Sequence, residues 1–542
     1  MTIRVWADFE TRSFCDLTKV GAWVYSEHPS TGIVCLAYAI DDFPVQWWVP
    51  PEAMLDWADE KNWTPWRGEG DNPRMAVFDG EFMGGIASNY GWSSRPCLGS
   101  TYGMPSDLYQ AIAHGAHVEV HNYSFEYSIW RNVMEKRYGW TPIPDENWRD
   151  TMAVACYYAL PAKLDSLARA TGFTGKDPKG WHLISKYSKL NLKTAKPIIP
   201  APDLEDFVNY CIEDVRVEQA ISDYLGDLPE REQQVFSLDL KMNTRGIYLD
   251  LEGIEAATAI VDQRSEELTT EFYKLTGLAP TQRDKCIAWF KDQGLALDNM
   301  QADYIEELLE EGEIPQGNAR RALEIRLAIN KASTKKLDAM ARNRGSDGRA
   351  RFQSRYHGAI TGRPTGAGFQ PLNLNKGYQD DGYDKMVPEQ LVRDIMYRDP
   401  KWLDRLYPGG AMDAVGKASR YWIKAEPGNK IIAGDLVSIE AVLLACLSGE
   451  EWKVEAFRQG RKMYELMGDK IYNFPEGTVT KATHPIERQD GKTGELAFGY
   501  QGALGAWLKF DSSGRHTDER ILEICKAWRA GHPMIVGLWR GL

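Results

Sequence analysis

Three pairs of polar side chains in the first 227 residues have the types and spacing of ligands for divalent cations. The pairs are Asp8 and Glu10, Asn122 and Glu126, and Tyr210 and Asp214. The first pair alternates along an expected strand, so both side chains point to one face of it. The second pair lies four residues apart at an expected strand-to-helix turn, and the third lies four apart on one face of an expected helix. Such a set can hold two divalent cations through protein and water oxygens, as hydrolysis of a phosphodiester requires.

A second carboxylate site is expected in the sequence KIIAGDLVSIEAVLLACLSGE, residues 430–450. The apolar residues 431–433 lead to Asp435, and Glu440 opens an apolar run over 441–447. This pattern predicts a buried strand that ends at Asp435, followed by a helix on the same core. A buried carboxylate is costly unless a cation or strong donors satisfy it, so Asp435 is a candidate metal ligand.

A third set follows about forty residues later, at steps of four residues: Arg488, Lys492, Leu496 and Tyr500. Residues at this spacing share one helix face. Cations on a helix bind phosphates, and a carboxylate binds a metal. The two sets together therefore indicate handling of a nucleoside triphosphate.

At this point the residues resemble a known family. GDLVSIEA, residues 434–441, resembles motif A of the family A (DNA polymerase I-like) DNA polymerases, and RQDGKTGELAFGYQG, residues 488–502, resembles their motif B in its phage form. The resemblance implies that Asp435 ligates metal, that Arg488 and Lys492 hold the incoming triphosphate, and that Glu440 blocks a ribose 2′-hydroxyl. It also implies that Tyr500 stacks near the templating base. Leu496 stands where relatives have Phe or Tyr, which bears on sugar discrimination.

The three N-terminal pairs, in their order, resemble the exonuclease motifs of the 3′–5′ proofreading domain, which has a ribonuclease-H-like fold. The resemblance implies that Asp8 and Asp214 ligate metal with Glu10 as a bridging ligand, and that Tyr210 orients the attacking water. Asn122 becomes a substrate contact. Glu126 departs from the family pattern, which usually has aspartate there, and its extra methylene shifts the carboxylate. It remains a candidate catalytic and metal-binding residue.

The stretch HGAITGRPTGAGFQPLNLNKG, residues 357–377, has the Gly, Thr and Pro content of a loop. It resembles the palm-entry motif of the same family, in which an arginine checks the minor groove at the primer end. Arg363 is the matching residue, and Gln370 and Asn373 are further candidate DNA contacts. An ordinary β-turn is the alternative interpretation of the TGR sequence taken by itself.

The elements that must position these residues follow from periodicity and from turn residues. Strands are expected at 3–9, 32–40, 45–49 and 117–120, with an irregular insertion at 60–104. Helices are expected from residues 105, 150 and 164, and over 202–225, 230–244, 252–276, 281–293, 302–311, 317–341, 451–472, 485–500 and 517–542. Residues 377–415 show little periodicity. The predicted fold class is α/β: a ribonuclease-H-like exonuclease domain (1–227), a mostly helical thumb (228–345), a partial palm with motif A (346–450) and fingers with motif B (451–542) of a right-hand polymerase.

The charge distribution supports a nucleic-acid partner. The whole chain carries a formal net charge of -13, but residues 318–376 contain 13 Lys and Arg against 3 Asp and Glu. A basic segment in an acidic protein is typical of a surface that follows phosphates. The expected partners are primer–template DNA and dNTPs, and the expected cofactor is Mg²⁺, two ions per active site, or Mn²⁺ in its place.

The eight cysteines are single and form no CxxC, which favours buried thiols in a reducing compartment. No apolar run reaches membrane-spanning length, and the N-terminus has no signal-peptide pattern. The sequence therefore predicts a soluble, cytoplasmic protein without a membrane partner, in the host-cell cytoplasm if it is phage-encoded.

One family feature is missing. The second catalytic aspartate of family A polymerases lies in a His-Asp-Glu turn (motif C), and the histidines after motif B, His516 and His532, stand in RHTD and GHPM instead. Either a second polypeptide supplies motif C, or the reading frame is interrupted; both explanations stay open. The alternative functions are a stand-alone 3′–5′ DNA exonuclease with an inactive, DNA-binding polymerase part, and a DNA-binding protein without catalysis.

Overall fold

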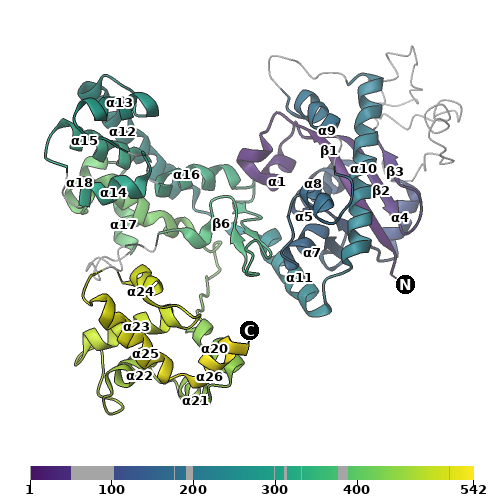
Figure 1. Cartoon of the computed structure of the whole chain (residues 1–542). Coiled ribbons are helices and arrows are strands. Elements are labelled where there is room, and N and C mark those ends of the chain that lie inside the picture. The colour runs from purple at the N-terminus through teal and green to yellow at the C-terminus, as the bar shows by residue number, and fades with distance from the viewer. Residues whose placement is uncertain are drawn as a thin grey trace, which may run out of the picture. The chain divides into compact units, whose positions relative to one another are not determined.

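The computed structural model describes residues 2–50, 103–175, 178–190, 199–297, 299–310, 314–330, 332–375, 377, 388–436, 438–511 and 513–541 (Figure 1). The chain forms two compact units, Met1–Lys430 and Ile431–Leu542. Nearly all of the expected insertion at 60–104 lies outside the described residues, as does part of 377–415. The boundary at residue 430 places motif A and motif B together in the second unit. The finer division into four domains stays a prediction.

The first unit begins with a five-stranded mixed sheet in the order β3-β2-β1-β4-β5. β1 pairs antiparallel with β2 and parallel with β4; β2 pairs antiparallel with β3, and β4 pairs parallel with β5. The strands are β1 (Arg4–Arg12), β2 (Gly32–Ile40), β3 (Gln46–Trp48), β4 (His117–Val120) and β5 (Trp148–Asp150). The four expected strands are confirmed. The three-residue β5 was missed because it is too short to show a period.

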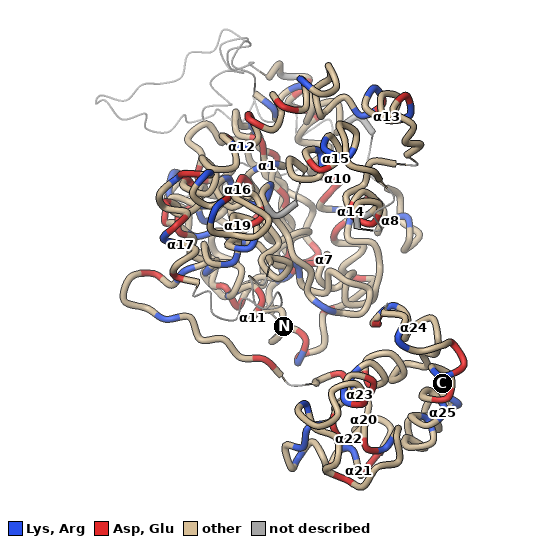
Figure 2. The backbone as a smooth tube through the Cα atoms, turned by 90° about the vertical axis from the view of Figure 1, so that its left-hand side faces the viewer, with Lys and Arg blue, Asp and Glu red and all other residues tan. Residues whose placement is uncertain are grey.

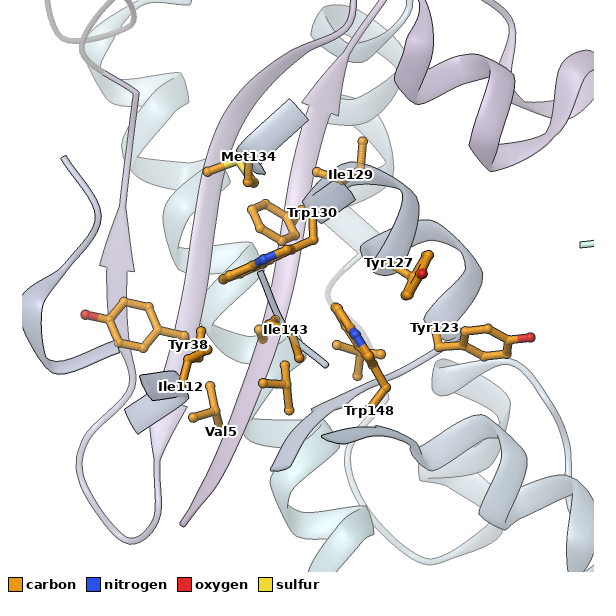
Figure 3. Packing of buried hydrophobic residues seen from close by; sticks show 14 of the residues in the cluster. Val5, Tyr38, Ile112, Tyr123, Tyr127, Ile129, Trp130, Met134, Ile143 and Trp148 are labelled. Carbon is orange, nitrogen blue, oxygen red and sulfur yellow. The ribbon is translucent and has the colours of Figure 1, made fainter. Parts of the chain in front are cut away.

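Alternation along β1 separates two cores. Val5 and Phe9 pack on one face of the sheet with Trp130, in the cluster that Figure 3 shows. Trp6 packs on the other face, with Phe207 of the long helix α10 (Ala201–Leu225). Because side chains alternate with period 2, the even-numbered acidic residues of β1 share the face of Trp6 and therefore point toward α10.

Helices and short turns surround the sheet (Figure 1). They are α1 (Leu17–Glu27), α4 (Ser106–Ala113), α5 (Tyr123–Ile129), η1 (Trp130–Glu135), α6 (Lys136–Tyr138), η2 (Asp145–Asn147), α7 (Thr151–Tyr157), α8 (Leu164–Ala170), α9 (Pro178–Leu183), η3 (Ile184–Ser188) and α10. The expected helices at 105, 150, 164 and 202–225 are confirmed within one or two residues.

The remainder of the first unit is mostly helical. Its elements are α11 (Glu230–Arg245), β6 (Ile247–Tyr248), α12 (Leu251–Thr276), α13 (Arg283–Asp292), α14 (Ala302–Glu310), α15 (Asn318–Asn330), α16 (Ala332–Asn343), β7 (Arg349–Ala350), β8 (Ser354–Arg355), β9 (Thr365–Gly366), η4 (Pro371–Asn373), α17 (Pro388–Met396), α18 (Pro400–Leu406), α19 (Gly410–Ala418) and η5 (Ser419–Trp422). The sequence missed α17 to α19. They are short, and two of them begin with proline at the first helical position.

The second unit contains only helices among its described residues. They are α20 (Ile439–Ser448), α21 (Glu451–Arg458), α22 (Met463–Tyr472), α23 (Pro485–Phe498), α24 (Leu504–Phe510), α25 (Asp518–Ala530) and α26 (Pro533–Gly541). The expected helix 451–472 is two helices separated near Gly460, whose φ is 65°. The expected helix 517–542 is likewise two helices, because Pro533 begins the second one.

The expected buried strand at 431–433 is wrong. These residues belong to no strand, and Ile431 and Ile432 are 59% and 94% exposed. Asp435 is exposed as well. A strand needs a neighbour for its backbone hydrogen bonds, and no strand among the described residues pairs with this segment. The following helix is confirmed as α20.

The expectation of buried thiols is only partly confirmed. Four of the described cysteines are buried and two are half-buried, but Cys446 is exposed; those described are all free thiols. No helix of the described part is long and apolar enough to cross a membrane.

Candidate active sites

The strongest candidate site lies between β1 and α10. Asp8, Glu10 and Asp214 each offer a carboxylate oxygen within 4.8 Å of the other two. Glu10 is 9% exposed and Asp214 only 3%. Strand β1 supplies Asp8 and Glu10, and helix α10 adds Asp214, which lies over two hundred positions later in the sequence.

A buried thiol that the sequence reasoning missed contacts one carboxylate of this group. Cys211 of α10 is fully buried, and its Sγ donates to the backbone oxygen of Asp8 at 3.2 Å and to Asp8 Oδ2 at 3.3 Å. Such a donor restricts the rotation of the carboxylate. The only sequence signal was its place beside Tyr210, in the segment NYCIED.

Tyr210 occupies the same helix as Asp214, one turn earlier. Its ring packs against Gly180 of α9: a Cβ built on that glycine would lie 2.1 Å from a ring carbon. Only a residue without a side chain leaves the ring in this position. The fold thereby fixes the tyrosine that sequence reasoning assigned to the site.

Asn122 and Glu126 lie at the start of α5. Asn122 adopts a left-handed conformation (φ 75°) before the helix, and its backbone N–H donates to Asp150 Oδ1 at 2.9 Å. Glu126 is 4% exposed. It lies outside the group of three carboxylates. Its charge acts on Glu218, which is four residues beyond Asp214 on α10.

A set of buried acids lies behind the group. Burial raises the pKa of Glu119 to about 7 and that of Asp150 to about 6. Burial, and then the charge of Glu119, raises the pKa of Glu218 well above its usual range, and Thr151 Oγ1 donates to Glu218 Oε1 at 3.3 Å. Burial thus favours the protonated form of Glu218. Sequence reasoning missed it, although its spacing from Asp214 places both on one helix face.

The palm-entry residues lie on a hairpin and the turn after it. Arg363 precedes β9 and is exposed. Gln370 has a φ of 55° and precedes η4, and Asn373 Nδ2 donates to Gln370 Oε1 at 3.3 Å. Lys336 of α16 donates to the carbonyl of Asn373 at 2.8 Å. The structure thus brings the two amide side chains together and joins them to the basic helix.

The basic segment is less open than its composition suggested. Arg326 is 9% exposed and donates to the carbonyl of Pro280, and Arg321 pairs with Glu271 at 2.7 Å. Cations and acids are interspersed around α15 and α16 (Figure 2). The cations of α15 therefore partly stabilise the fold, and Lys335 of α16 is among those exposed to solvent.

In the second unit, the motif B residues lie along α23. Its inner face is buried and includes Gly491, where a Cβ would lie 2.3 Å from the carbonyl oxygen of Tyr464 on α22. On this helix Arg488 and Lys492 are half-buried and Leu496 is 41% exposed. Tyr500 is 65% exposed but lies beyond the end of α23, so the expectation that all four residues share one helix face is wrong for it. Arg488 also lies 3.7 Å from Glu465.

The motif A residues stand apart from this arrangement. Asp435 lies in the extended segment before α20, and Glu440 lies in the first turn of α20. Both side chains are on exposed residues. Leu444 of α20 meets the end of α23 at Gly499, where a Cβ would lie 3.3 Å from it. The sequence thus predicted the helices of this region, but not the open position of Asp435.

Comparison with known proteins gives matches that cover nearly the whole chain. No family model matches the chain. A protein named DNA polymerase from Bacillus phage SP02 is 29% identical over 547 residues, which cover 98% of this chain and 74% of that protein. The polymerase domain of Pol1 from M. smegmatis, in complex with DNA primer-template and dNTP, aligns with a TM-score of 0.48 at 14% identity, over 100% of this chain and 74% of that one. The chain is thus similar over nearly its whole length to a phage protein named DNA polymerase.

Proposed function

We propose that this chain is a DNA-directed DNA polymerase of the family A type with a 3′–5′ proofreading exonuclease. DNA polymerase function is supported by the similarity to the Bacillus phage protein over 98% of the chain. The exonuclease is supported by one observation above all: Asp8, Glu10 and Asp214 converge within 4.8 Å. The sheet order 3-2-1-4-5, with β1 to β3 antiparallel and β4 and β5 parallel, supports a ribonuclease-H-like domain.

The donor set fits Mg²⁺. Three carboxylates within 4.8 Å repel one another unless a cation neutralises them, and hard oxygen ligands are those that Mg²⁺ prefers. Asp8, Glu10 and Asp214 would hold it, with Glu126 as a further candidate. When bound, the metal supplies activation of a water and neutralisation of the leaving 3′ oxygen.

The protein groups around this site have distinct roles in the proposal. Cys211 holds the Asp8 carboxylate by its Sγ contact. Tyr210, fixed by Gly180, orients the attacking water through its hydroxyl. Asn122 contacts the DNA strand from the start of α5. Each role needs a fixed side chain rather than a mobile one, since catalysis depends on the position of the reacting groups.

For polymerisation, the exposed face of α23 binds the incoming dNTP. Arg488 and Lys492 contact its phosphates, Tyr500 stacks near the templating base, and Leu496 lies beside the sugar. Asp435 is a metal ligand and Glu440 excludes the ribose 2′-hydroxyl. Arg363, with Gln370 and Asn373, contacts the primer end.

A stand-alone 3′–5′ exonuclease is the second candidate. One observation favours it: Asp435 is exposed, outside any strand, whereas the three nuclease carboxylates are already together. In that case the second unit and the basic segment bind DNA without extending it.

The test of the nuclease is Asp8→Ala on a 5′-labelled single strand with Mg²⁺. We expect a loss of digestion of a hundredfold or more, because the metal site loses a ligand, with unchanged DNA binding. Glu213→Gln is the matched control: this acid lies next to Asp214 on α10 but is exposed and pairs with Arg216. Undiminished digestion by Asp8→Ala would refute the site.

A further inference from the structure

A buried charge network holds the inner side of α23. Lys453 of α21 is 1% exposed, and its Nζ donates to Glu495 Oε2 of α23 at 2.6 Å. Trp528 of α25 donates from Nε1 to the other oxygen, Glu495 Oε1, at 2.9 Å. Lys453 Nζ also lies 3.2 Å from Nε2 of His532, which is fully buried before α26. Three helices, and the residue that precedes a fourth, therefore meet in this network.

The proton positions in this network follow from its partners. His532 Nδ1 lies 2.7 Å from the carbonyl oxygen of Trp528, which can only accept, so Nδ1 carries a proton and donates. Burial, and then the charge of Lys453, lowers the pKa of His532 to about 3. The ring is therefore neutral at pH 7, and its Nε2 accepts from the ammonium group. Every polar atom at the centre has a partner.

Such a network is a poor source of stability. Removing two charges from water costs about as much as their attraction returns, and well-packed apolar residues of similar volume are often as good or better. A fully satisfied polar network does, however, permit one arrangement of the elements that it joins. In this unit the network therefore favours one rotation of α23 about its own axis.

The rotation of α23 decides where the motif B side chains point. Glu495 follows Lys492 by three residues and precedes Leu496 by one. At 100° per residue, Arg488 lies about 20° and Lys492 about 60° from Glu495 around the helix axis, so the rotation that turns Glu495 inward also sets the directions of these two cations. Backbone contact at Gly491 fixes the distance to α22, whereas the Glu495 carboxylate is an ionic contact whose two oxygens each have a specified donor.

We propose that Glu495, held by Lys453, is a positioning residue that sets the rotation of α23 and thereby aligns Arg488 and Lys492 with the triphosphate of the incoming nucleotide. The inference rests on the proposed function of α23. Glu495 does not touch the nucleotide; it acts through the helix.

The test separates position from stability with a double variant of the full chain. Glu495→Leu alone leaves the Lys453 ammonium buried without its anion, so we expect a large fall in Tm. Lys453→Met combined with Glu495→Leu removes both charges, so we expect most of the Tm to return. If Glu495 positions the helix, the affinity for a fluorescently labelled dNTP in the double variant stays about tenfold or more below that of the wild type.

Recovery of both Tm and wild-type dNTP affinity in the double variant would overturn the inference, because the network would then be only structural. Arg488→Ala with Lys492→Ala distinguishes this from a failure of the proposed function. If that variant binds labelled dNTP as tightly as the wild type, α23 is no triphosphate site and the inference falls with it.

Glu450→Gln is the control for buried charge in this unit. Glu450 is 2% exposed and accepts from the backbone N–H groups of Met534 and Ile535, so it caps α26 and does not contact α23 through these bonds. We expect Glu450→Gln to lower Tm and to leave dNTP affinity within twofold of the wild type. A tenfold loss of affinity in this control would overturn the assignment to Glu495, because any loss of buried charge would then have the same effect.

Discussion

Side chains at the candidate nuclease site are positioned by residues from other segments, and the types of the site residues do not predict these contacts. The thiol of Cys211 donates to the carboxylate of Asp8. The ring of Tyr210 occupies space that a side chain at position 180 would fill. Both contacts join segments far apart in sequence. They make the geometry of the site sensitive to changes that leave the carboxylates themselves intact.

Gly180→Ala tests the position of Tyr210. The new methyl group would lie 2.1 Å from the ring, so the tyrosine must move. We expect the single-turnover rate of digestion of a labelled single strand to fall about tenfold to a hundredfold, as misplacement by an ångström commonly costs, with little change in Tm. Gly32→Ala is the control, because nothing lies within 4 Å of a Cβ there. Equal rates for the two variants would show that Tyr210 has no part in hydrolysis.

The buried His532 makes the free energy of unfolding of the second unit decrease as the pH falls. Its pKa is lowered to about 3 in the fold but has its ordinary value near 6.5 in the unfolded chain. Below about pH 6.5 the unfolded state therefore binds the extra proton, and the free energy of unfolding falls by up to about 1.4 kcal/mol per pH unit. This contribution is fully present above pH 6.5 and is lost as the pH falls toward 3.

Urea unfolding at pH 7 and pH 4.5 measures this effect. The decrease in stability between the two pH values should be smaller in His532→Gln than in the wild type, since glutamine does not titrate. His114→Gln, at an exposed position on the first unit, should keep the wild-type decrease. The same decrease in all three proteins would contradict a buried neutral imidazole.

At this scale the sequence indicated which residues belong to the candidate site, but not which residues from other segments contact them. The group of Asp8, Glu10 and Asp214 followed from alternation on a strand and from one helix face. Cys211 and Glu495 did not, because a thiol or a glutamate in a helix is ordinary until the partner from another segment is known.

At the scale of elements, periodicity was a good guide where segments were long. The strands β1 and β2 and the helix α10 agree with their sequence patterns, whereas α17 to α19 are short and were missed. The apolar run 431–433 shows the opposite error. An apolar run becomes a strand only beside another strand, and none of the described strands pairs with it.

The basic helices α15 and α16 also divide by burial, which leads to a prediction. Lys335 is exposed, so Lys335→Ala should weaken binding of duplex DNA and reduce the slope of log affinity against log salt by about 1. Arg326 is buried and donates to Pro280, so Arg326→Ala should lower stability by about 2 kcal/mol and leave the salt slope unchanged. Filter binding at several salt concentrations, with thermal unfolding, measures both. An unchanged slope in Lys335→Ala would exclude α16 from the DNA-binding surface.

At the scale of the whole molecule, the two proposed activities belong to different units. The nuclease carboxylates lie in Met1–Lys430, and α23 lies in Ile431–Leu542. The nuclease group is assembled from one unit alone, whereas the polymerase assignment depends on an exposed Asp435, and the sequence has no His-Asp-Glu turn after motif B. The account therefore predicts that the first activity exists without the second.

One experiment tests this central claim directly. The purified chain is incubated with Mg²⁺ and a 5′-labelled primer–template, with and without all four dNTPs. We predict that the primer is shortened in both reactions, and that Asp8→Ala abolishes the shortening while Glu213→Gln does not. Lengthening of the primer with dNTPs would contradict the prediction that the nuclease acts without extension, and shortening that survives Asp8→Ala would contradict the nuclease site itself.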